Sequence, residues 1–331
     1  MPEPIFRIKG VTKVFGHKTI LKDISLDVNH GEIFGIIGAS GSGKTTLLNI
    51  MIGFLKPNTG DVLFRQDHLL DLKKAYVFRS VFQKPEDVKK IYGFASQAPS
   101  FYGSLTVKEN LVYFGSLYNL TKDAIATNVE TLLNLMGLKN SEHLLAKNLS
   151  GGMERRLDIA CSLIHDPKLL ILDEPTADLD PVLRNHIWEL VKKVNKKGTT
   201  IIIASHHLNE IEALCDRIAI LRDTRLVDVG SPDKVKMRFT RKQEILVQCY
   251  PGNYEKIIAG LKHKKITEAE KRGGEMVIHT KMPKKVLEEL LHILDELNEQ
   301  LVDIRVSKPS LDDIFILMSE KVENEAGQDN K

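Results

Sequence analysis

"GIIGASGSGKTT", residues 35–46, is the stretch of sequence that decides the fold. Residues 38–45 within it fit the pattern GxxxxGK[ST], with a strand-like apolar run before them and helix-like sequence after them. This context indicates a P-loop, whose glycines let backbone N–H groups close around phosphates at the N-terminus of a helix. A glycine-rich turn between a strand and a helix, without a ligand, is the alternative.

The residues of this loop have distinct expected roles. Lys44 reaches the β- and γ-phosphates of a nucleotide, and the Thr45 hydroxyl binds Mg²⁺. The residues that we expect to contact the nucleotide are Gly38, Ala39, Ser40, Gly41, Ser42, Gly43, Lys44, Thr45 and Thr46.

A second motif, "LLILDEP" at 169–175, is an apolar strand that ends in two acids. Asp173 would lie at the C-terminal end of its strand, where such sheets bind ligands, and would hold Mg²⁺ through water. Glu174 would lie beside the γ-phosphate as the general base for the attacking water. Two solvated acids in a turn are the alternative, but the P-loop upstream favours the catalytic pair.

The composition limits the class of protein. At 331 residues the chain is long enough for two domains, and its 42% hydrophobic and 27% charged residues are typical of globular proteins. The net charge of +3 gives no reason to expect nucleic acid as a partner. Cys161, Cys215 and Cys249 are far apart among apolar neighbours, which predicts buried free thiols in a reducing cytosol.

Two features bear on a membrane role. "MPEPIFRIKG", residues 1–10, lacks a basic region followed by a long apolar run, so no signal peptide is expected. Apolar runs such as "LLIL", residues 169–172, are far shorter than the ~18 residues of a membrane span. Any membrane role is therefore expected to come through a partner.

The first two-thirds of the chain alternates strand-like and helix-like stretches, which predicts an α/β fold with a largely parallel sheet. Strands are expected at 32–38, 168–174 and 199–205, because these apolar runs suit strands buried on both faces. Residues 105–165 are mainly helical in pattern and form an insertion between two core strands. The charged stretch 64–91 is expected to be a solvated surface excursion.

After about Pro232 the pattern changes to strand, helix, hairpin, helix, strand. The order βαββαβ predicts a small ferredoxin-like α+β domain, followed by a final helix that Ser310 caps. The expected domains are a nucleotide-binding domain over 1–235 with a helical subdomain at about 100–165, an accessory domain over 240–320, and a disordered tail over 321–331.

Four motifs in this order resemble the ATPase subunits of ATP-binding-cassette (ABC) transporters: the P-loop, "NLSGGM" (148–153), "LLILDEPTADLD" (169–180) and "ASHH" (204–207). The resemblance covers residues 5–235. It implies a cassette that binds ATP with Mg²⁺ and hydrolyses it.

The resemblance also assigns a role to "LSGG". Ser150, Gly151 and Gly152 would be the signature loop, which caps the γ-phosphate of ATP held on the P-loop of the other subunit. Met153 stands where many members have glutamine, and methionine is familiar there among exporter ATPases. A capped helix start is the alternative for this segment taken alone.

Further residues are assigned by the resemblance alone. Gln97 resembles the Q-loop glutamine, which touches Mg²⁺ and links the site to the membrane subunits; a surface glutamine is the alternative. His206, rather than the adjacent His207, resembles the switch histidine at the γ-phosphate. Phe15 resembles the aromatic residue that stacks on adenine, with an ordinary core phenylalanine as the alternative.

The loop after the second motif is also assigned by resemblance. Asp180 resembles the acid of the D-loop at the dimer interface. Asp178 departs from the usual small residue of that loop, which leaves the detailed geometry of the loop open.

The ending "KPSLDDIFI", residues 308–316, is similar to that of exporter ATPases. The resemblance therefore implies a subunit at the cytoplasmic face of the membrane, peripheral to a separate integral-membrane permease. It would dimerise on ATP with a second copy of itself or a paralogous ATPase.

Three other classes of protein fit the sequence less well than an exporter subunit does. A soluble cassette ATPase acting on ribosomes or DNA usually joins two cassettes or inserts a long coiled coil. A catalytically dead module would not be expected to keep Lys44, Asp173, Glu174 and His206. A GTPase would carry an NKxD motif after a core strand, and none is present.

Overall fold

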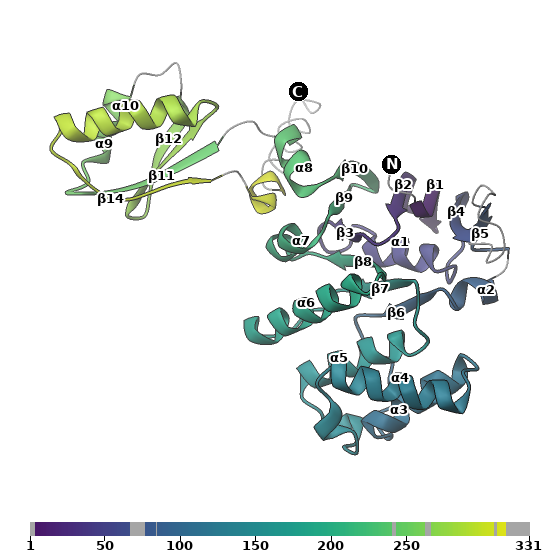
Figure 1. Ribbon diagram of the computed structural model, residues 1–331. Coiled ribbons are helices and arrows are strands. Elements are labelled where there is room, and N and C mark those ends of the chain that lie inside the picture. The colour runs from purple at the N-terminus through teal and green to yellow at the C-terminus, as the bar shows by residue number, and fades with distance from the viewer. Residues whose placement is uncertain are drawn as a thin grey trace. The chain divides into compact units, whose positions relative to one another are not determined.

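The computed structural model describes residues 4–66, 77–83, 85–239, 243–261, 266–307 and 310–315. The chain divides into two compact units, Met1–Pro232 and Asp233–Lys331 (Figure 1). Each unit has its own hydrophobic core. The residues of the first core come from the range 5–229, and those of the second come from the range 245–304. The tail that the sequence predicts to be disordered, residues 321–331, lies outside the described residues.

A six-stranded sheet forms the centre of the first unit. Three of its strands are buried along their whole length, as expected for parallel strands that are covered on both faces, and they confirm the three strands predicted from the apolar runs. In spatial order the strands are β10 (Arg225–Gly230), β9 (Arg217–Arg222), β3 (Ile33–Ile37), β8 (Thr200–Ser205), β7 (Leu169–Asp173) and β6 (Tyr92–Ala95). All neighbouring pairs are parallel except β9 with β10.

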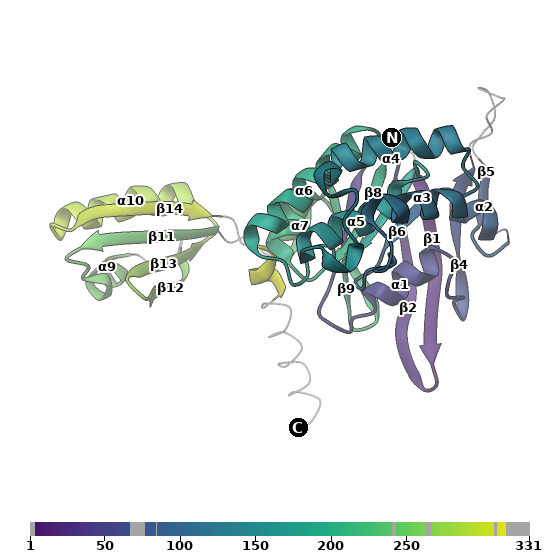
Figure 2. The same ribbon diagram turned by 90° about the horizontal axis from the view of Figure 1, so that it is seen from below.

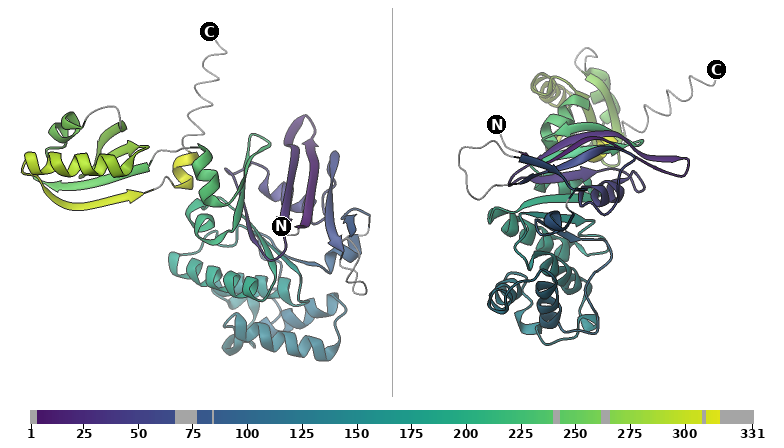
Figure 3. Two further views of the ribbon diagram at one scale, coloured as in Figure 1. Left: turned by 45° about the horizontal axis from the view of Figure 1, so that its top comes forward. Right: turned by 90° about the vertical axis from the view of Figure 1, so that its right-hand side faces the viewer.

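A second sheet lies over one face of the first, with helix α1 (Lys44–Met51) in the core between them (Figure 3). Leu47 and Leu48 of α1 share this core with Phe34 of β3 and Phe64. The strands of the second sheet, in spatial order, are β2 (Lys18–Asn29), β1 (Pro4–Phe15), β4 (Thr59–Gln66) and β5 (Val77–Ser80), all antiparallel.

The other face of the six-stranded sheet is covered by helices. They are α5 (Gly151–Leu163), α6 (Pro181–Lys196) and α7 (Leu208–Leu214). Helix α7 lies so close to β3 that a Cβ atom on Gly35 would be 2.7 Å from Ile211 Cγ2. A larger residue at position 35 of β3 would therefore clash with this helix.

The expectation that 64–91 is a solvated excursion is wrong in part. Phe64 lies in β4 and is buried, β5 adds an edge strand, and α2 (Pro85–Lys89) follows. Val81 and Val88 are also fully buried in the core of the first unit. The charged residues between these apolar positions make the stretch look exposed when only its composition is considered. Residues 67–76 and 84 lie outside the described part of the chain.

The predicted helical insertion between β6 and β7 is confirmed. It contains α3 (Val107–Leu117), α4 (Lys122–Leu135), two short 3₁₀ turns (Lys139–Ser141 and Ala146–Asn148) and α5. Thr106 and Glu109 form a capping box at the start of α3, and Thr121 caps α4. Helix α5 also contacts β6, so the insertion is attached to the central sheet through the helix that follows "LSGG".

The second unit contains the predicted βαββαβ order. After α8 (Pro232–Phe239) come β11 (Gln243–Tyr250), α9 (Tyr254–Gly260), β12 (Ile266–Arg272), β13 (Glu275–Thr280), α10 (Pro283–Glu296) and β14 (Gln300–Ser307). The sheet is antiparallel in the order β12-β13-β11-β14, and residues of both α9 and α10 pack into its core. Ser310 caps the final turn, since its Oγ accepts a hydrogen bond from Asp313 N–H at 3.1 Å.

Two predictions about the whole chain can be checked on the described residues. All three cysteines are free and buried, as expected. None of the helices in the described ranges is both long and apolar enough to cross a membrane.

Candidate nucleotide-binding site

The P-loop links β3 to α1 and closes tightly on itself. A Cβ on Gly38 would lie 2.4 Å from the carbonyl oxygen of Leu221, and Gly43 has φ 100° at the N-cap of α1, so both positions require glycine. The buried Lys44 Nζ donates hydrogen bonds to the carbonyl oxygens of Gly38 at 2.9 Å and Ala39 at 3.3 Å. The lysine charge is therefore held at the mouth of the loop.

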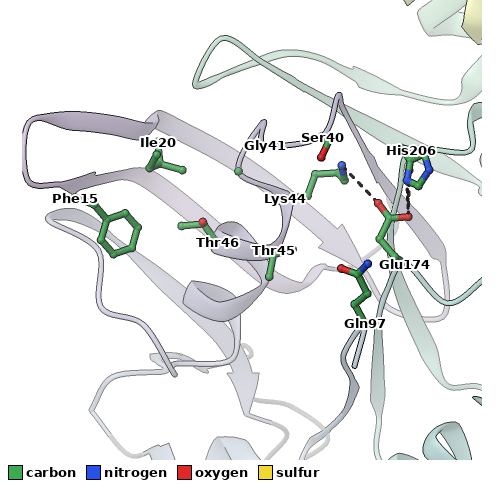
Figure 4. Close-up of a pocket in the computed structure, with 11 residues that line it drawn as sticks. Phe15, Ile20, Ser40, Gly41, Lys44, Thr45, Thr46, Gln97, Glu174 and His206 are labelled. Carbon is green, nitrogen blue, oxygen red and sulfur yellow. Dashed lines mark hydrogen bonds and ion pairs between the residues drawn. The ribbon is translucent and has the colours of Figure 1, made fainter. Parts of the chain in front are cut away.

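A pocket of about 470 Å³ opens beside this loop (Figure 4). It is lined by Phe15, Ile20, Ser40, Gly41, Gly43, Lys44, Thr45, Thr46, Gln97, Glu174 and His206. Phe15 is 49% exposed at the end of β1, so the alternative of an ordinary core phenylalanine is wrong. Gln97, which follows β6, is exposed and lines the pocket.

The two motifs, which are 128 residues apart, meet at Thr45, a residue that lines this pocket. Thr45 Oγ1 donates to Asp173 Oδ2 at 2.8 Å. The other carboxylate oxygen, Asp173 Oδ1, is buried and has no hydrogen-bond partner among the residues that the structure describes. Burial raises the pKa of Asp173, and the hydrogen bond from Thr45 acts in the opposite direction. The hydroxyl oxygen of Thr45 and the carboxylate oxygens of Asp173 thus lie close together, and Asp173 Oδ1 is available to bind a further group.

Glu174 occupies a turn just beyond β7 with φ 48°, a left-handed conformation that is strained for a residue with a Cβ. The turn directs its carboxylate toward a lysine and a histidine. Its Oε1 lies 3.6 Å from Lys44 Nζ, and its Oε2 lies 2.9 Å from His206 Nδ1 (Figure 4). Strain of this kind concentrates at functional sites, where surrounding contacts hold it in place.

The two adjacent histidines have different surroundings. His206 lines the pocket, whereas His207 is the N-cap of α7 and its backbone N–H donates to Ser205 Oγ at 3.0 Å. Geometry therefore favours His206 as the histidine that would meet a bound phosphate.

Some predicted site residues do not line the pocket. Gly38, Ala39, Ser42 and Asp173 are not among its lining residues, and Gly38 and Ala39 supply carbonyl oxygens to Lys44. Asp180 is the N-cap of α6, with its Oδ1 accepting from the Val182 N–H at 2.9 Å and the Leu183 N–H at 3.0 Å. Asp178, in the same loop, has φ 60°.

The "LSGG" loop is also outside the pocket. Ser150 is the N-cap residue of α5 by position, but its side chain makes no capping hydrogen bond, which argues against the simple capped-helix alternative. Ser150 and Gly151 are exposed, and a Cβ on Gly151 would meet no atom within 4 Å. Gly152 is buried against Leu183 of α6, where a Cβ would lie 2.9 Å from a methyl carbon. The loop is therefore anchored at Gly152 and open at its first two residues.

Arg155 is an important residue that sequence reasoning missed. It is buried in α5 and donates to the carbonyl oxygens of Ser96 at 2.6 Å, Asp173 at 3.0 Å and Pro175 at 3.0 Å. It also pairs with Asp158 at 3.2 Å. One side chain thus ties the helix after "LSGG" to the segment before Gln97 and to the end of β7.

The sequence contains only a weak signal for this arginine. Arg155 and Asp158 have the i, i+3 spacing of a helical ion pair. However, residues 154–158 contain four charged side chains, and their order does not reveal which two point inward.

Known protein families and relatives match nearly the whole length of this chain. Residues 21–177 match the family model described as ABC transporter, and residues 230–318 match the model described as ATP-binding protein DrrA1-3-like, C-terminal domain. The chain is 30% identical to linearmycin resistance ATP-binding protein LnrL of Bacillus subtilis, over 94% of this chain and 97% of that protein. It is also 30% identical to Nod factor export ATP-binding protein I of a Rhizobium species, over 94% and 96% of the two chains.

Solved structures of ABC transporter ATPases are similar in fold to this chain. The structure of cbiO1 from Clostridium perfringens, part of the ABC transporter complex cbiONQ, is similar with a TM-score of 0.62 and 29% identity, covering 70% of this chain and 90% of that chain. A nucleotide-free ATP-binding cassette from an ABC transporter has a TM-score of 0.60 and 26% identity, covering 71% and 94%. With its P-loop, its acidic strand end and its "LSGG" helix in this arrangement, the chain belongs to the ABC transporter family as one of its ATP-binding, ATP-hydrolysing subunits.

Proposed function

We propose that this chain hydrolyses ATP in the pocket of Figure 4 and thereby drives export through a separate integral-membrane permease. The observation that carries the proposal is the meeting of two segments distant in the chain at one pocket: Lys44 of the P-loop lies beside Glu174, and Thr45 hydrogen-bonds to Asp173. Similarity over nearly the whole chain to linearmycin resistance and Nod factor export proteins supports the direction of transport.

Each wall of the pocket would hold a different part of ATP. Phe15, exposed at the rim, would stack on the adenine ring. The loop from Gly38 to Thr46 would surround the phosphates with backbone N–H groups. Lys44 would exchange its hydrogen bonds to the loop carbonyls for bonds to the β- and γ-phosphates.

The residues present fit a magnesium ion beside the phosphates. Thr45 Oγ1 and Asp173 Oδ2 are already 2.8 Å apart, and Asp173 Oδ1 is a buried acceptor to which no described residue donates. Thr45, Asp173 and Gln97 would hold the ion together with phosphate oxygens, as is usual for a cation that keeps few protein ligands. When bound, Mg²⁺ would supply positive charge against the phosphate oxygens.

Glu174 is the group best placed to act as the general base. Its carboxylate lies in the pocket beside Lys44, and the turn at φ 48° fixes its position. His206 would hold Glu174 through the 2.9 Å contact to Nδ1 and would present its other ring nitrogen to the γ-phosphate.

The signature loop would complete the site of a second subunit. Ser150 and Gly151 are exposed and away from the pocket of their own chain, so their open backbone is available to a nucleotide bound elsewhere. A two-fold dimer, formed with a second copy or a paralogous ATPase, would contain two composite sites. Binding of ATP between the subunits would close this dimer.

The location of the chain follows from its proposed partner. We place it at the cytoplasmic face of the membrane, held there by the permease. A soluble ATPase that acts on ribosomes or DNA is the competing function, and no feature of the site favours it.

Isolation of the full-length tagged chain from membranes tests the proposal. We expect a polytopic membrane protein to co-purify and to raise the rate of ATP hydrolysis on reconstitution. The matched control is the Lys44→Ala chain, which should retain the partner but show no hydrolysis. Isolation with ribosomes or DNA, and without a membrane protein, would refute it.

A further inference from the structure

The C-terminal sheet has two edges of different character. Strand β14 is the outer neighbour of β11, and no strand in the described part of the chain pairs with its other side (Figure 2). Its outer row of backbone N–H and C=O groups can therefore form hydrogen bonds with a further strand. Strand β12 forms the opposite edge, next to β13.

Exposed apolar side chains distinguish β14 from β12. Leu301, Val302 and Val306 are 37%, 59% and 47% exposed, although a strand beside a hydrophobic core usually covers such residues. Strand β12, "ITEAEKR", contributes no large exposed hydrophobic residue among those described and is rich in charge, a common protection of an edge strand. The apolar edge is thus confined to β14.

The order of residues in β14 is self-complementary for antiparallel pairing. Its centre reads "VDIRV", residues 302–306. Residues 303–307 of β14 pair in regular register with β11, and the register shifts by one residue at Val302. If two such strands run antiparallel about Ile304, Asp303 of each faces Arg305 of the other, and Val302 of each comes opposite Val306 of the other. Both opposite-charge pairs form at once, because a two-fold axis at Ile304 relates them.

Other two-fold registers lose this match. Centring on Asp303 places two aspartates opposite each other, and centring on Arg305 places two arginines opposite each other, both of which are unfavourable. Within the chain, Asp303 and Arg305 lie on the same face of the sheet, opposite Gln248 and Leu246 of β11. Arg305 also pairs with Glu275 of β13 at 2.7 Å and with Asp303 of its own strand at 3.0 Å, and it would share these partners with the Asp303 of a second copy.

We propose that the β14 strands of two copies of this chain pair antiparallel about Ile304, joining their four-stranded sheets into one continuous sheet. Backbone hydrogen bonds would supply the contact, the two Asp303–Arg305 pairs would set the register, and the Val302–Val306 pairs would cover the exposed apolar margin. The occupant of this edge is a second copy, because the charge pattern of the strand complements itself.

This contact goes beyond the proposed ATP-driven dimer. None of its residues belongs to the nucleotide pocket, so it requires no ATP. A nucleotide-independent link would keep two cassettes at a high effective concentration after their ATP has been hydrolysed. The second unit would then act as a dimerisation domain that favours rapid reassembly of the composite sites.

Cysteine pairing tests the register in the full-length chain without nucleotide. Val302→Cys and Val306→Cys chains are prepared separately, mixed and oxidised; the three native cysteines are buried. Directly opposed residues have Cα atoms about 4.5–5.5 Å apart, within the range of a disulfide. The mixture should therefore cross-link, to about half of the dimers if subunits exchange at random.

Each cysteine chain alone is the control for this register. Two copies of the same position would lie four residues apart along the paired strands, about 13 Å, too far for a disulfide. Cross-linking of the mixture well above both controls supports the pairing. Equal cross-linking in all three samples, or none in the mixture, overturns it.

Charge reversal provides a second, independent measurement. Asp303→Arg and Arg305→Asp should each weaken the nucleotide-free dimer several-fold in sedimentation, because like charges then face each other. Mixing these two chains should restore the dimer, since each arginine now faces an aspartate. A variant that simply fails to fold cannot be rescued in this way.

Arg272→Asp is the matched control. Arg272 is an exposed arginine on β12, paired with Glu270 at 3.5 Å, and lies at the opposite edge of the same sheet. Its reversal should leave the dimer unchanged. A wild-type chain that stays monomeric without nucleotide, a mixture that is not rescued, or an equal loss in Arg272→Asp would refute the proposal.

Discussion

Glu174 Oε2 lies 2.9 Å from His206 Nδ1, although the two residues are 32 positions apart in the chain. Glu174 stands just after β7 and His206 just after β8, and these strands are parallel neighbours with Asp173 opposite Ala204. Their C-terminal ends therefore lie at the same edge of the sheet, where α/β proteins bind ligands. The contact joins a proposed base to the residue that positions it.

Glu174→Gln should retain ATP binding but slow hydrolysis by about 10²-fold or more, because the amide cannot accept a proton from water. ATP should then hold two subunits together, which size-exclusion chromatography would detect as a dimer. Glu189→Gln, an exposed change on α6, is the control and should behave as wild type. Full activity of the Glu174 variant would move the base elsewhere, with His206 the next candidate.

Lys44→Ala should abolish productive ATP binding, since it removes the charge that faces the β- and γ-phosphates. Nucleotide titration measures this directly. Lys197→Ala removes an exposed lysine that does not line the pocket and should leave the affinity unchanged. Equal affinity and hydrolysis in both variants would contradict the P-loop assignment.

A mixture of two inactive chains tests the composite site. Lys44→Ala and Ser150→Arg homodimers should each fail, the second because a bulky side chain blocks the exposed start of α5. In a mixed dimer both lesions fall in one composite site and the other site is intact. Random exchange should restore about a quarter of all sites, measured as ATP occupancy and as hydrolysis. If mixed dimers form and neither recovers, the two-subunit site is wrong.

Arg155→Ala should destabilise the first unit by roughly 3–5 kcal/mol, because it leaves the buried Asp158 carboxylate without its cationic partner. Urea unfolding gives the free energy. Asp158→Asn in the same chain should recover part of the loss, since the neutral side chain no longer needs a counter-charge. An Arg155→Ala variant with wild-type stability would show that the network of Ser96, Asp173 and Pro175 carbonyls does not depend on this arginine.

Removal of residues 240–331 should leave a folded cassette that binds ATP. The two hydrophobic cores share no residue, and all pocket residues precede the cut. Circular dichroism and nucleotide titration measure the outcome. If the shortened chain is insoluble or cannot bind nucleotide, the proposed domain boundary is misplaced.

Much of the fold follows from local sequence. The apolar runs that became β3, β7 and β8 are buried on both faces, and such strands need no alternation to be recognised. The burial within the charged stretch 64–91 is less evident from the sequence, because charged segments separate its buried residues Phe64, Val81 and Val88. Their burial depends on the sheet and helix that cover them, and those elements come from elsewhere in the chain.

The sequence by itself determined the P-loop, because its glycines, lysine and threonine act within one continuous turn and its geometry is local. It also placed Asp173 at the end of a strand and ordered the elements of both units. Only the tertiary structure decided that Glu174 meets Lys44 and His206, that Arg155 points inward, and that β14 is an edge strand of the sheet formed by the described residues. These relationships join residues distant in the chain, and strand order and helix packing, rather than local conformational preference, set the distances between them.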